Sequence, residues 1–509
     1  MERQGRARRR VQQELEVGVS VRPKGHGLIA LTASERAQIR DAALTILATI
    51  GMADTPKDLL ALALAKGASL RGDGRLVFPR SLVEDAIGRA AKRVSLPGFK
   101  EDRGLTIGGG EVHIGTGGAA VQILDAKKVA FRDTQLSDLY AIMRVLEASP
   151  NVHYGVRPLI ARDLADPFEL DINTAFACMK ATSKPIGVSF ERAAHVAPVI
   201  ALFDQALAPS HRFATRPFSM AIIVHVVPPL RFAGEGLAVL QECVRLGMPL
   251  QICSAGQAGA TAPVTLAGSL AQGLAECLAG LLLLDCLAPG HPCIFALMPF
   301  VSDLRSGAMT GGSGEAAIAS AAAAQLLADL ELPSTVSAGI TESKIADAQA
   351  GYEKGYSVAL AAHAGADMIN LSVGMLGSIM VASPEALVID DDMCGAILRS
   401  LRGIAVSADT LDLASIERVV VGPGHYLGEP ETFARMRSDY VYPTLADRQS
   451  VQDWMEAGAT PIWERACTRV RQILAAEPPA HLSAEAEARI RAAFPIRLPP
   501  VHLPEEPRP

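Results

Sequence analysis

The sequence predicts an α/β protein built on a closed TIM barrel, (β/α)8, with helical extensions at its N-terminal and C-terminal ends. Its composition, 49% apolar and 20% charged over 509 residues, is typical of a globular chain. From about residue 110 onward, short β-branched runs alternate with longer Ala/Leu-rich stretches, as in parallel strands joined by crossover helices. Seven strand candidates recur at intervals of ~25–40 residues, which fits a barrel of eight with one strand missed. A doubly wound open sheet is the alternative.

The N-terminal residues 1–105 are expected to be a tail followed by a helical region. A basic cluster at residues 6–10 has no apolar stretch after it, so it predicts a solvated tail rather than a secretory signal. Apolar residues near helical spacing predict a helix over Ser34–Gly51, closed by the glycine. Two more helices are expected over residues 57–66 and 81–92.

The barrel domain is expected to span residues 106–420. Its strand candidates are Val152–Val156, Ile186–Phe190, Ser219–Val226, Leu250–Ser254, Cys293–Leu297, Thr335–Ala338 and Met368–Ser372. Its helix candidates are residues 169–182, 192–207, 232–246, 264–287, 314–330 and 346–365. The missing strand is expected near Glu111–Gly115 or after Pro384.

The C-terminal part divides into two expected segments. Residues 421–475 predict a helical region, in which Trp454 and Trp463 lie one helical face apart. Residues 476–509 carry many prolines and predict a loosely ordered tail.

Charge and cysteine content argue against several classes of protein. A formal net charge of −6 disfavours nucleic acid as a partner. The most apolar run, Cys277–Leu284, is far shorter than the ~20 residues of a membrane-spanning helix, so we expect a soluble, cytoplasmic protein with no membrane partner. Eight cysteines without a C-x-x-C do not predict a disulfide scaffold. The tightest group is Cys286, His291 and Cys293. Metal ligation is possible there, but buried cysteines usually behave as small apolar side chains, so no metal site is expected.

Two glycine-rich segments resemble ligand-binding loops. Gly115–Ala120 matches G-x-G-x-x-A, but a strand-like run and a turn follow it where a dinucleotide site needs a helix, so a glycine hairpin is favoured. Gly311–Glu315 opens a predicted Ala-rich helix with Ser313 as the natural N-cap. Plain capping is favoured over anion binding there.

Many polar side chains lie just past the C-terminal ends of the predicted strands, where a TIM barrel has its active site. They are Glu191, His225, Ser254, Gln257, Asp303, Arg305, Ser343, Lys344, Asp347, Gln349, Tyr352, Glu353 and Asn370. Each alone is more typical of a structural residue, but together they predict a pocket at the barrel mouth. The densest polar stretch is Thr341–Glu353.

Several long motifs occur in register along the chain. They are Gly256-Gln-Ala-Gly-Ala-Thr-Ala-Pro-Val-Thr-Leu-Ala-Gly268, Asp303-Leu-Arg-Ser-Gly307, Ser343–Glu353, Gly422-Pro-Gly-His-Tyr-Leu427, and Asp447-Arg-Gln-Ser450 followed by Trp454 and Gly458. Through them, residues 30–475 resemble the trimethylamine methyltransferase family of corrinoid-dependent methyltransferases. The resemblance implies a TIM barrel that moves a methyl group from an amine to the cobalt of a separate corrinoid protein.

Two departures from the family pattern are visible. The trimethylamine enzymes carry pyrrolysine in the barrel, and the resemblance places that position near Ile340, after Ala338-Gly339; this chain has standard residues throughout. The His-Thr that usually follows the His-Tyr-Leu motif appears here as Glu431-Thr432. Relatives without pyrrolysine include glycine betaine:corrinoid methyltransferases, so the resemblance points to that branch.

Amine chemistry supports the same branch. Trimethylamine has a lone pair, which the pyrrolysine imine accepts, and its methyl groups are poor electrophiles until the nitrogen is cationic. A quaternary ammonium is already cationic and has no lone pair, so attack on its methyl group releases a neutral tertiary amine without such an electrophile. The absence of pyrrolysine therefore favours a small quaternary amine of betaine type, with orientation and electrostatics as the enzyme's contribution.

The candidate site follows from the resemblance and from this chemistry. A quaternary ammonium is held by aromatic faces and carboxylates, each cation–π contact contributing ~0.5–2 kcal/mol. The expected substrate-binding residues are Phe190, Phe300, Arg305, Ile340, Tyr352 and Tyr356, with Tyr154 behind them. The expected catalytic residues are Glu191, His225 and Glu353. Arg305 is expected either to hold a substrate carboxylate in a bidentate grip or to pair with Asp303 or another acid.

The corrinoid protein is the expected partner. The residues expected to face it are Gly256, Gly311, Gly312, Ser343 and Lys344, since glycine lets a large partner approach the backbone. No cofactor is expected to be bound permanently, because the corrinoid (cobalamin) arrives on the partner, and a neutral leaving amine needs no zinc. A homo-oligomer is compatible with the sequence. Two alternatives stay open: a differently reacting enzyme on the same barrel, and a non-catalytic relative that binds a quaternary amine.

Overall fold

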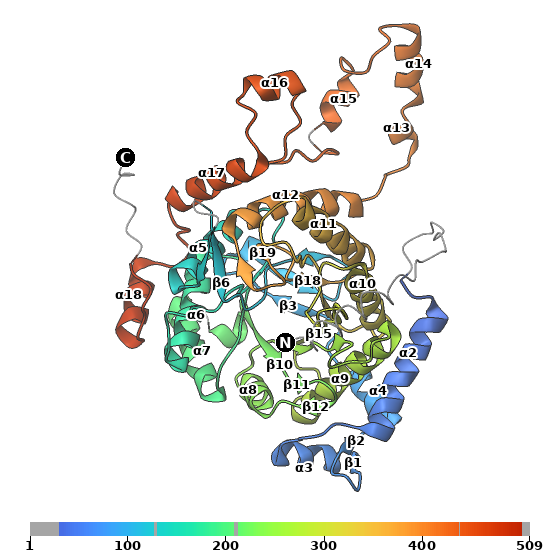
Figure 1. Cartoon of the computed structure of the whole chain (residues 1–509), viewed down its shortest axis with the longest axis vertical. Coiled ribbons are helices and arrows are strands. Elements are labelled where there is room, and N and C mark those ends of the chain that lie inside the picture. The colour runs from blue at the N-terminus through green and yellow to red at the C-terminus, as the bar shows by residue number, and fades with distance from the viewer. Residues whose placement is uncertain (1–29, 127–129, 208–211, 437, 501–509) are drawn as a thin grey trace, which may run out of the picture.

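The computed structural model of the chain describes residues 30–126, 130–207, 212–436 and 438–500, and at its centre lies a barrel of eight parallel strands (Figure 1). The strands, in the order in which they neighbour one another, are β5 (His113–Ile114), β18 (Met368–Asn370), β17 (Ser334–Ser337), β15 (Cys293–Leu297), β13 (Leu250–Ser254), β10 (Ser219–Val224), β9 (Ile186–Val188) and β8 (Gly155–Val156). A parallel bridge between Gly115 and Tyr154 joins the two end strands. The predicted closed barrel is therefore confirmed.

All seven predicted strands are present, and the missing eighth is β5, inside the predicted Glu111–Gly115 segment. The other suggested location, after Pro384, is the helix α12 (Pro384–Leu401). Glycine at 115 lets the two end strands meet, because a Cβ at this position would lie 2.4 Å from the Tyr154 ring. Gly115–Ala120 accordingly continues along residues 154–160 and does not itself form a hairpin; the hairpin is β6 (Gln122–Asp125) with β7 (Ala130–Asp133).

One helix follows each barrel strand in the chain. These helices are α5 (Leu136–Glu147), α6 (Pro167–Ala181), α7 (Val196–Ala206), α8 (Gly234–Arg245), α9 (Leu266–Leu287), α10 (Gly314–Ala328), α11 (Ala348–His363) and α12. Figure 1 shows them as a ring around the strands. The six helices predicted between strands are confirmed, with ends that differ by a few residues.

Helix α9 is apolar on every side because a second layer covers it. Helices α2 (Ala33–Thr45), α3 (Lys57–Ala65) and α4 (Arg80–Arg89) pack against its outer face. Among the described helices it alone is long and apolar enough to cross a membrane, and 89% of its most apolar window is buried inside the protein. The N-terminal helical region is therefore part of the protein core.

The N-terminal end of the barrel is closed by a hairpin. Strands β3 (Val94–Leu96) and β4 (Leu105–Ile107) pair antiparallel, and their apolar side chains cluster with Tyr154, Met220, Ile294 and Met368 from the barrel interior. The opposite end carries the longer loops, with the parallel pair β14 (Gln257–Ala258) and β16 (Phe300–Val301) and the hairpin β19 (Met375–Leu376) with β20 (Val381–Ala382). The hairpin therefore covers the N-terminal end of the barrel, and loops surround the C-terminal end.

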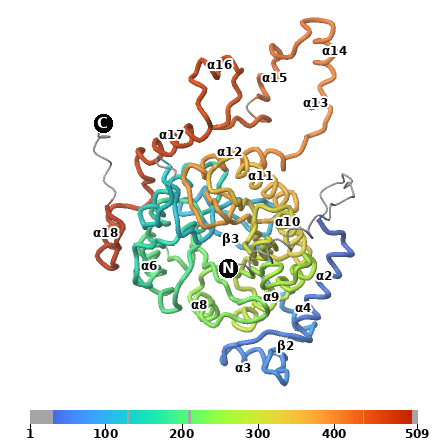
Figure 2. The backbone as a smooth tube through the Cα atoms, in the orientation of Figure 1, coloured from blue at the N-terminus to red at the C-terminus, as the bar shows by residue number. Residues whose placement is uncertain are grey.

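After α12 the chain leaves the barrel and later returns to it. Helices α13 (Ala408–Leu411), α14 (Leu413–Val421), α15 (Pro430–Arg435) and α16 (Val451–Glu456) lie on a projection, and α17 (Ile462–Ala475) packs on α12 and α5 (Figures 1 and 2). Residues 476–500 differ from the expected loose tail, because α18 (Ala484–Ala493) packs on α7 with Ile490 fully buried. Pro478, Pro479 and Pro495 lie in the irregular segments on either side of this helix.

Candidate functional site

The barrel mouth is lined by apolar side chains at the C-terminal strand ends. Ile222, Ala255 and Phe300 are half-buried and pack over a buried layer of Cys253, Ala296 and Met298. Phe300 is the first residue of β16, which prolongs β15 upward beside β14. This arrangement leaves an aromatic ring and aliphatic walls accessible at the top of a filled barrel.

A polar layer lies beneath the mouth, inside the barrel. The Gln251 side-chain oxygen accepts hydrogen bonds from Thr335 Oγ1 at 3.3 Å and from Asn370 Nδ2 at 3.4 Å. The Tyr154 hydroxyl contacts Asn370 Oδ1 and donates to the Ile369 carbonyl at 2.9 Å. All four side chains are buried and hydrogen-bonded, so the layer forms a rigid floor. Tyr154, expected behind the substrate, belongs to this floor.

The glycine turn before α10 holds one of the protein's own carboxylates. Glu342 Oε1 accepts from Gly311 N at 2.7 Å and from Gly312 N at 3.1 Å, and Ser378 Oγ lies 3.3 Å away. Ser313 caps α10 as predicted, its side chain accepting from the Ala316 amide. The amides of Gly311, Gly312 and Ala316 are thus satisfied within the chain.

Glu353 organises the loop after β17. Its Oε2 accepts from the Thr341 hydroxyl and from Glu342 N at 3.0 Å, and its Oε1 accepts from Gln349 Nε2 at 2.9 Å. In the same loop Ser343 Oγ donates to Asp347 Oδ1 at 2.8 Å. Glu353 is buried, so its position suits holding the loop rather than reaching into the mouth.

Ile340 is buried against the glycine turn. A Cβ on Gly311 would lie 2.3 Å from Ile340 Cγ2, so glycine at 311 is what makes room for this side chain. Tyr356 lies on α11, and its hydroxyl donates a hydrogen bond to the Gly312 carbonyl. Burial and nearby acids, Glu353 foremost, raise the pKa of Tyr356 to about 12, so it stays a neutral donor. Tyr352 is exposed on α11.

Phe190 and Glu191 lie across the mouth, after β9. Phe190 is half-buried against the main core, and Glu191 is exposed. The Glu191 amide donates to Asp171 Oδ2 at 2.9 Å, and that oxygen lies 2.6 Å from His195 Nδ1. Burial raises the pKa of Asp171 despite this contact. Glu191 therefore has its backbone fixed and its carboxylate in solvent.

His225 lies behind the strand, away from the mouth. It is fully buried, and its Nε2 lies 2.9 Å from the Glu276 carbonyl of α9. Burial lowers the pKa of His225 to about 4, so it is neutral at physiological pH. The Glu276 carboxylate accepts from Ser254 Oγ at 2.7 Å and from Leu230 N at 2.9 Å. The geometry gives His225 a structural contact with the helix.

Arg305 pairs with Asp303, which is the second of the two arrangements expected for it. Its guanidinium forms a bidentate pair with Asp303, at 3.0 Å and 2.8 Å, on the exposed surface. The Arg305 hydrogen bond holds the pKa of Asp303 at about 2. Both line a cleft of about 410 Å³ near the start of α10. Asp303 takes up the Nε and one Nη2 donor of Arg305, so a substrate carboxylate would have to displace Asp303 or share the guanidinium with it.

The expected partner-facing residues are divided between surface and interior. Lys344 is exposed and donates to the Glu342 carbonyl at 2.7 Å. Gly256, Gly311, Gly312 and Ser343 are buried by neighbouring loops. No group of three or more His, Cys, Asp or Glu residues that could hold a metal occurs among the described residues. His291 Nε2 lies 3.0 Å from the Met248 carbonyl, so the Cys286, His291 and Cys293 group has an ordinary structural explanation.

The structure thus brings Gly311, Gly312, Ile340, Glu353 and Tyr356 into one cluster, with Phe300 on the neighbouring strand extension. Glu191 and Phe190 lie on another side, and His225 and Arg305 lie outside the mouth. Sequence reasoning missed Glu342, which fills the glycine turn, and Glu276, which is buried under Ser254. A carboxylate inside an apolar helical run was the available signal for Glu276.

Comparisons with known proteins give consistent names. A family model described as trimethylamine methyltransferase (MTTB) matches residues 2–497. A trimethylamine methyltransferase MttB from Desulfitobacterium hafniense (strain DSM 10664 / DCB-2) is 28% identical over 484 residues, which is 95% of this chain and 96% of that protein. A glycine betaine methyltransferase from Desulfitobacterium hafniense (strain Y51) is 28% identical over 469 residues, 91% of this chain and 95% of that protein. The crystal structure of the Methanosarcina barkeri monomethylamine methyltransferase has a TM-score of 0.46 and 12% identity, covering 88% of this chain and 93% of that one.

Proposed function

The chain belongs to the trimethylamine methyltransferase family, and we propose that it transfers a methyl group from a quaternary amine of betaine type to the corrinoid cobalt of a separate protein. The observation that carries the choice of substrate is Ile340. An ordinary aliphatic side chain, buried against Gly311, stands near the position at which the resembling trimethylamine enzymes carry pyrrolysine. A relative named as a glycine betaine methyltransferase supports the same choice.

The proposed reaction needs no electrophile from the protein. The two electrons of the breaking C–N bond leave with nitrogen, which departs as a neutral tertiary amine, and reduced corrinoid cobalt supplies the electron pair that receives the methyl group. The work left to the chain is to hold the ammonium with one methyl group pointing outward. A rigid floor and a fixed wall provide that orientation.

Phe300 is the aromatic face that we propose for the ammonium group. Its ring is half-buried beside Ile222 and Ala255, so a cation over it is partly shielded from water. Cation–π contact is worth up to ~2 kcal/mol when the cation is desolvated. Glu191, exposed across the mouth, is the acid that balances the positive charge in this proposal. Glu353 and His225 act as positioning residues through the 341–343 loop and α9.

The rim around the mouth fits a protein partner. Large apolar side chains are exposed at the end of, or in the segments that follow, five consecutive strands of the barrel. They are Val224, Val227, Val264, Leu304, Ile345, Tyr352 and Met380. Exposed apolar patches of this kind, interspersed with polar residues such as Lys344, are typical of protein interaction sites. A corrinoid protein seated on this rim would bring its cobalt over Phe300.

The direct test mixes the purified enzyme, a reduced corrinoid protein and a panel of glycine betaine, choline, tetramethylammonium and trimethylamine. The visible spectrum of the corrin reports methylation. We expect turnover with a quaternary amine and none with trimethylamine. Phe300→Ala should raise KM for the quaternary amine about tenfold or more, with Phe131→Ala, an exposed aromatic on β7, as the matched control. Binding of betaine without methylation under full reduction would instead identify a non-catalytic relative, and turnover without any corrinoid would identify a different enzyme.

A further inference from the structure

The chain carries a second apolar surface, far from the barrel mouth. Residues 402–460, here called the arm, project from the barrel between α12 and α17 (Figures 1 and 2). Fifteen large apolar side chains between Ile404 and Met455 are exposed, Ile404 at 89%, Leu427 at 87% and Val421 at 82%. Only Val419 and Leu445 are buried among the large apolar residues described there. The arm therefore has almost no core of its own.

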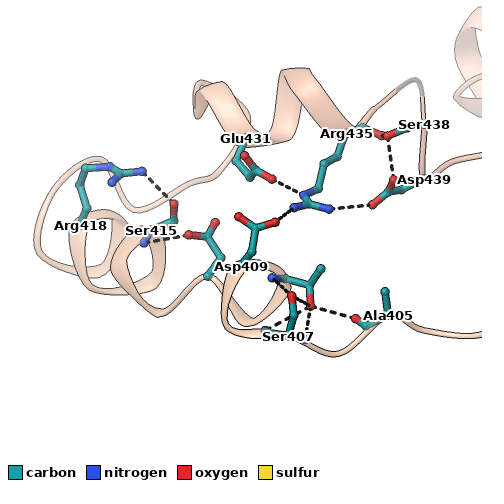
Figure 3. A network of polar contacts seen from close by, with 11 residues as sticks. Ala405, Ser407, Asp409, Ser415, Arg418, Glu431, Arg435, Ser438 and Asp439 are labelled. Carbon is teal, nitrogen blue, oxygen red and sulfur yellow. Dashed lines mark hydrogen bonds and ion pairs between the residues drawn. The ribbon is translucent and has the colours of Figure 1, made fainter.

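The polar side of the arm, in contrast, is satisfied within the chain. Arg435 contacts the carboxylates of Glu431, Asp409 and Asp439, and Ser407 and Thr410 cap each other's backbone (Figure 3). Arg418 pairs with Glu429 in the same way. These contacts define the course of the arm while its apolar side chains point into solvent. Since exposed ion pairs contribute little, they cannot by themselves keep such an arm folded.

We propose that the arm is an interface between two copies of this chain. Its area is sufficient: fifteen exposed large apolar side chains, at on the order of 50–100 Å² each, meet the ~800 Å² per partner of a stable interface. Two clefts of about 1070 and 930 Å³ border the arm and are large enough for side chains of a second protein. Tyr426, Tyr440 and Tyr442 line the smaller one, and tyrosine is enriched at interfaces.

The character of the surface favours a second copy over the corrinoid protein. A partner that must leave after each methyl transfer needs a small, partly polar contact, which the barrel rim provides. A permanent interface is larger and more apolar, like a domain core cut in half, and that describes the arm. In a dimer with a two-fold axis every contact occurs twice. If the arm of one copy packs on any part of the second copy, the arm of the second copy packs on the same part of the first, so both arms are covered.

Sedimentation equilibrium of the full chain at micromolar concentration tests the proposal. We expect twice the monomer mass of 53.5 kDa for the wild type. The double variant Val421→Glu/Leu427→Glu should weaken self-association on the order of a hundredfold and sediment as a monomer. Leu304→Glu, at an apolar residue on the rim that is 67% exposed, is the control and should keep the dimer while lowering methyl transfer.

Folding and alternative occupants are controlled separately. Val421 and Leu427 make no buried contact within one chain, so the circular dichroism of the variant should equal that of the wild type. Hydrogen exchange of the α14 amides should be slow in the wild type, faster on dilution and faster in the variant. A monomeric wild type overturns the proposal, and so does an arm variant that keeps the dimer mass. A monomeric wild type whose arm variant loses methyl transfer would place the corrinoid protein on the arm.

Discussion

Replacing Gly311 with alanine would test the proposed role of the turn beside Ile340. A Cβ on Gly311 would lie 2.3 Å from Ile340 Cγ2, 2.6 Å from its Cβ and 3.0 Å from its Cδ1. Normal carbon contacts begin near 3.5 Å, so Ile340 or the turn must recede by roughly 1 Å. Gly314, three residues later, is the matched control, because nothing lies within 4 Å of a Cβ there.

The structure allows the size of the effect to be worked out. Overpacking of this kind costs about 1–3 kcal/mol of stability. A displacement near 1 Å at a site whose task is orientation costs up to ~100-fold in rate. Ile340→Ala alone removes the clashing Cγ2 and Cδ1 atoms but leaves a cavity, at about 2–5 kcal/mol. The double variant should therefore lose less stability than the sum of the two single-variant losses. The difference is limited, because Ile340 Cβ remains and a Cβ on Gly311 would lie 2.6 Å from it.

Denaturant unfolding and methyl-transfer kinetics are measured on five proteins: the wild type, Gly311→Ala, Ile340→Ala, the double variant of these two, and the control Gly314→Ala. We expect Gly311→Ala to lower the unfolding midpoint and kcat/KM and Gly314→Ala to change neither by more than a small amount. The double variant should lose less, in both quantities, than the sum of the Gly311→Ala and Ile340→Ala losses. Additive losses would refute the reasoning, because they would show that Gly311 and Ile340 are not in contact. Unchanged kinetics in Gly311→Ala would remove the turn from the proposed site.

Three further predictions concern charged groups. Burial raises the pKa of Asp391 from its ordinary 3.8 to about 6, so the unfolded chain binds fewer protons between these values and stability should fall as pH rises from about 4 to 6; Asp391→Asn should flatten that dependence in urea titrations at several pH values. Lys354→Met should cost about 3–5 kcal/mol by leaving Asp390 buried without its ion pair, and adding Asp390→Leu should recover part of the loss in unfolding midpoint, since the buried Gly374 amide then loses its acceptor. Arg305→Ala should leave the ratio of KM values for betaine and choline unchanged within twofold, because the Arg305 charge is paired with Asp303 on the exposed surface; a selective loss of betaine would show that Arg305 reaches the substrate carboxylate.

The barrel was predictable because each of its longer strands can be identified from the few residues that form it. Cys293–Leu297 is a continuous apolar run, and Leu250–Ser254 has apolar residues at three of its five positions; the structure has strands with the same ends. Strand β5 was harder because only two residues pair regularly and glycines surround it. Helix α18 was missed because prolines near it signalled disorder, whereas its burial depends on α7, nearly three hundred residues earlier in the chain.

The site was predictable only in part, because its contacts are long-range. The segment after β17 was recognised by its polar density, and it does lie at the C-terminal edge of the barrel. Periodicity, however, cannot tell that Glu342 turns back to the Gly311 amide, or that His225 faces α9 rather than the mouth. Within a strand, successive side chains point to opposite faces of the sheet. Beyond the end of the strand this alternation no longer holds, so the direction of a side chain there cannot be predicted from its position in the sequence.

Two exposed apolar surfaces, the rim and the arm, impose opposite requirements on one chain. In the proposed reaction the rim must let a corrinoid protein depart after each transfer, and its apolar residues are spread among separate segments with charges such as Lys344 between them. The arm concentrates its apolar residues in one segment and pairs its charges internally, as Arg435 does with three acids. If both surfaces served the same partner, that partner would be held too tightly to exchange. Separating a permanent contact from a transient one allows both, and it places the permanent contact where it leaves the barrel mouth free.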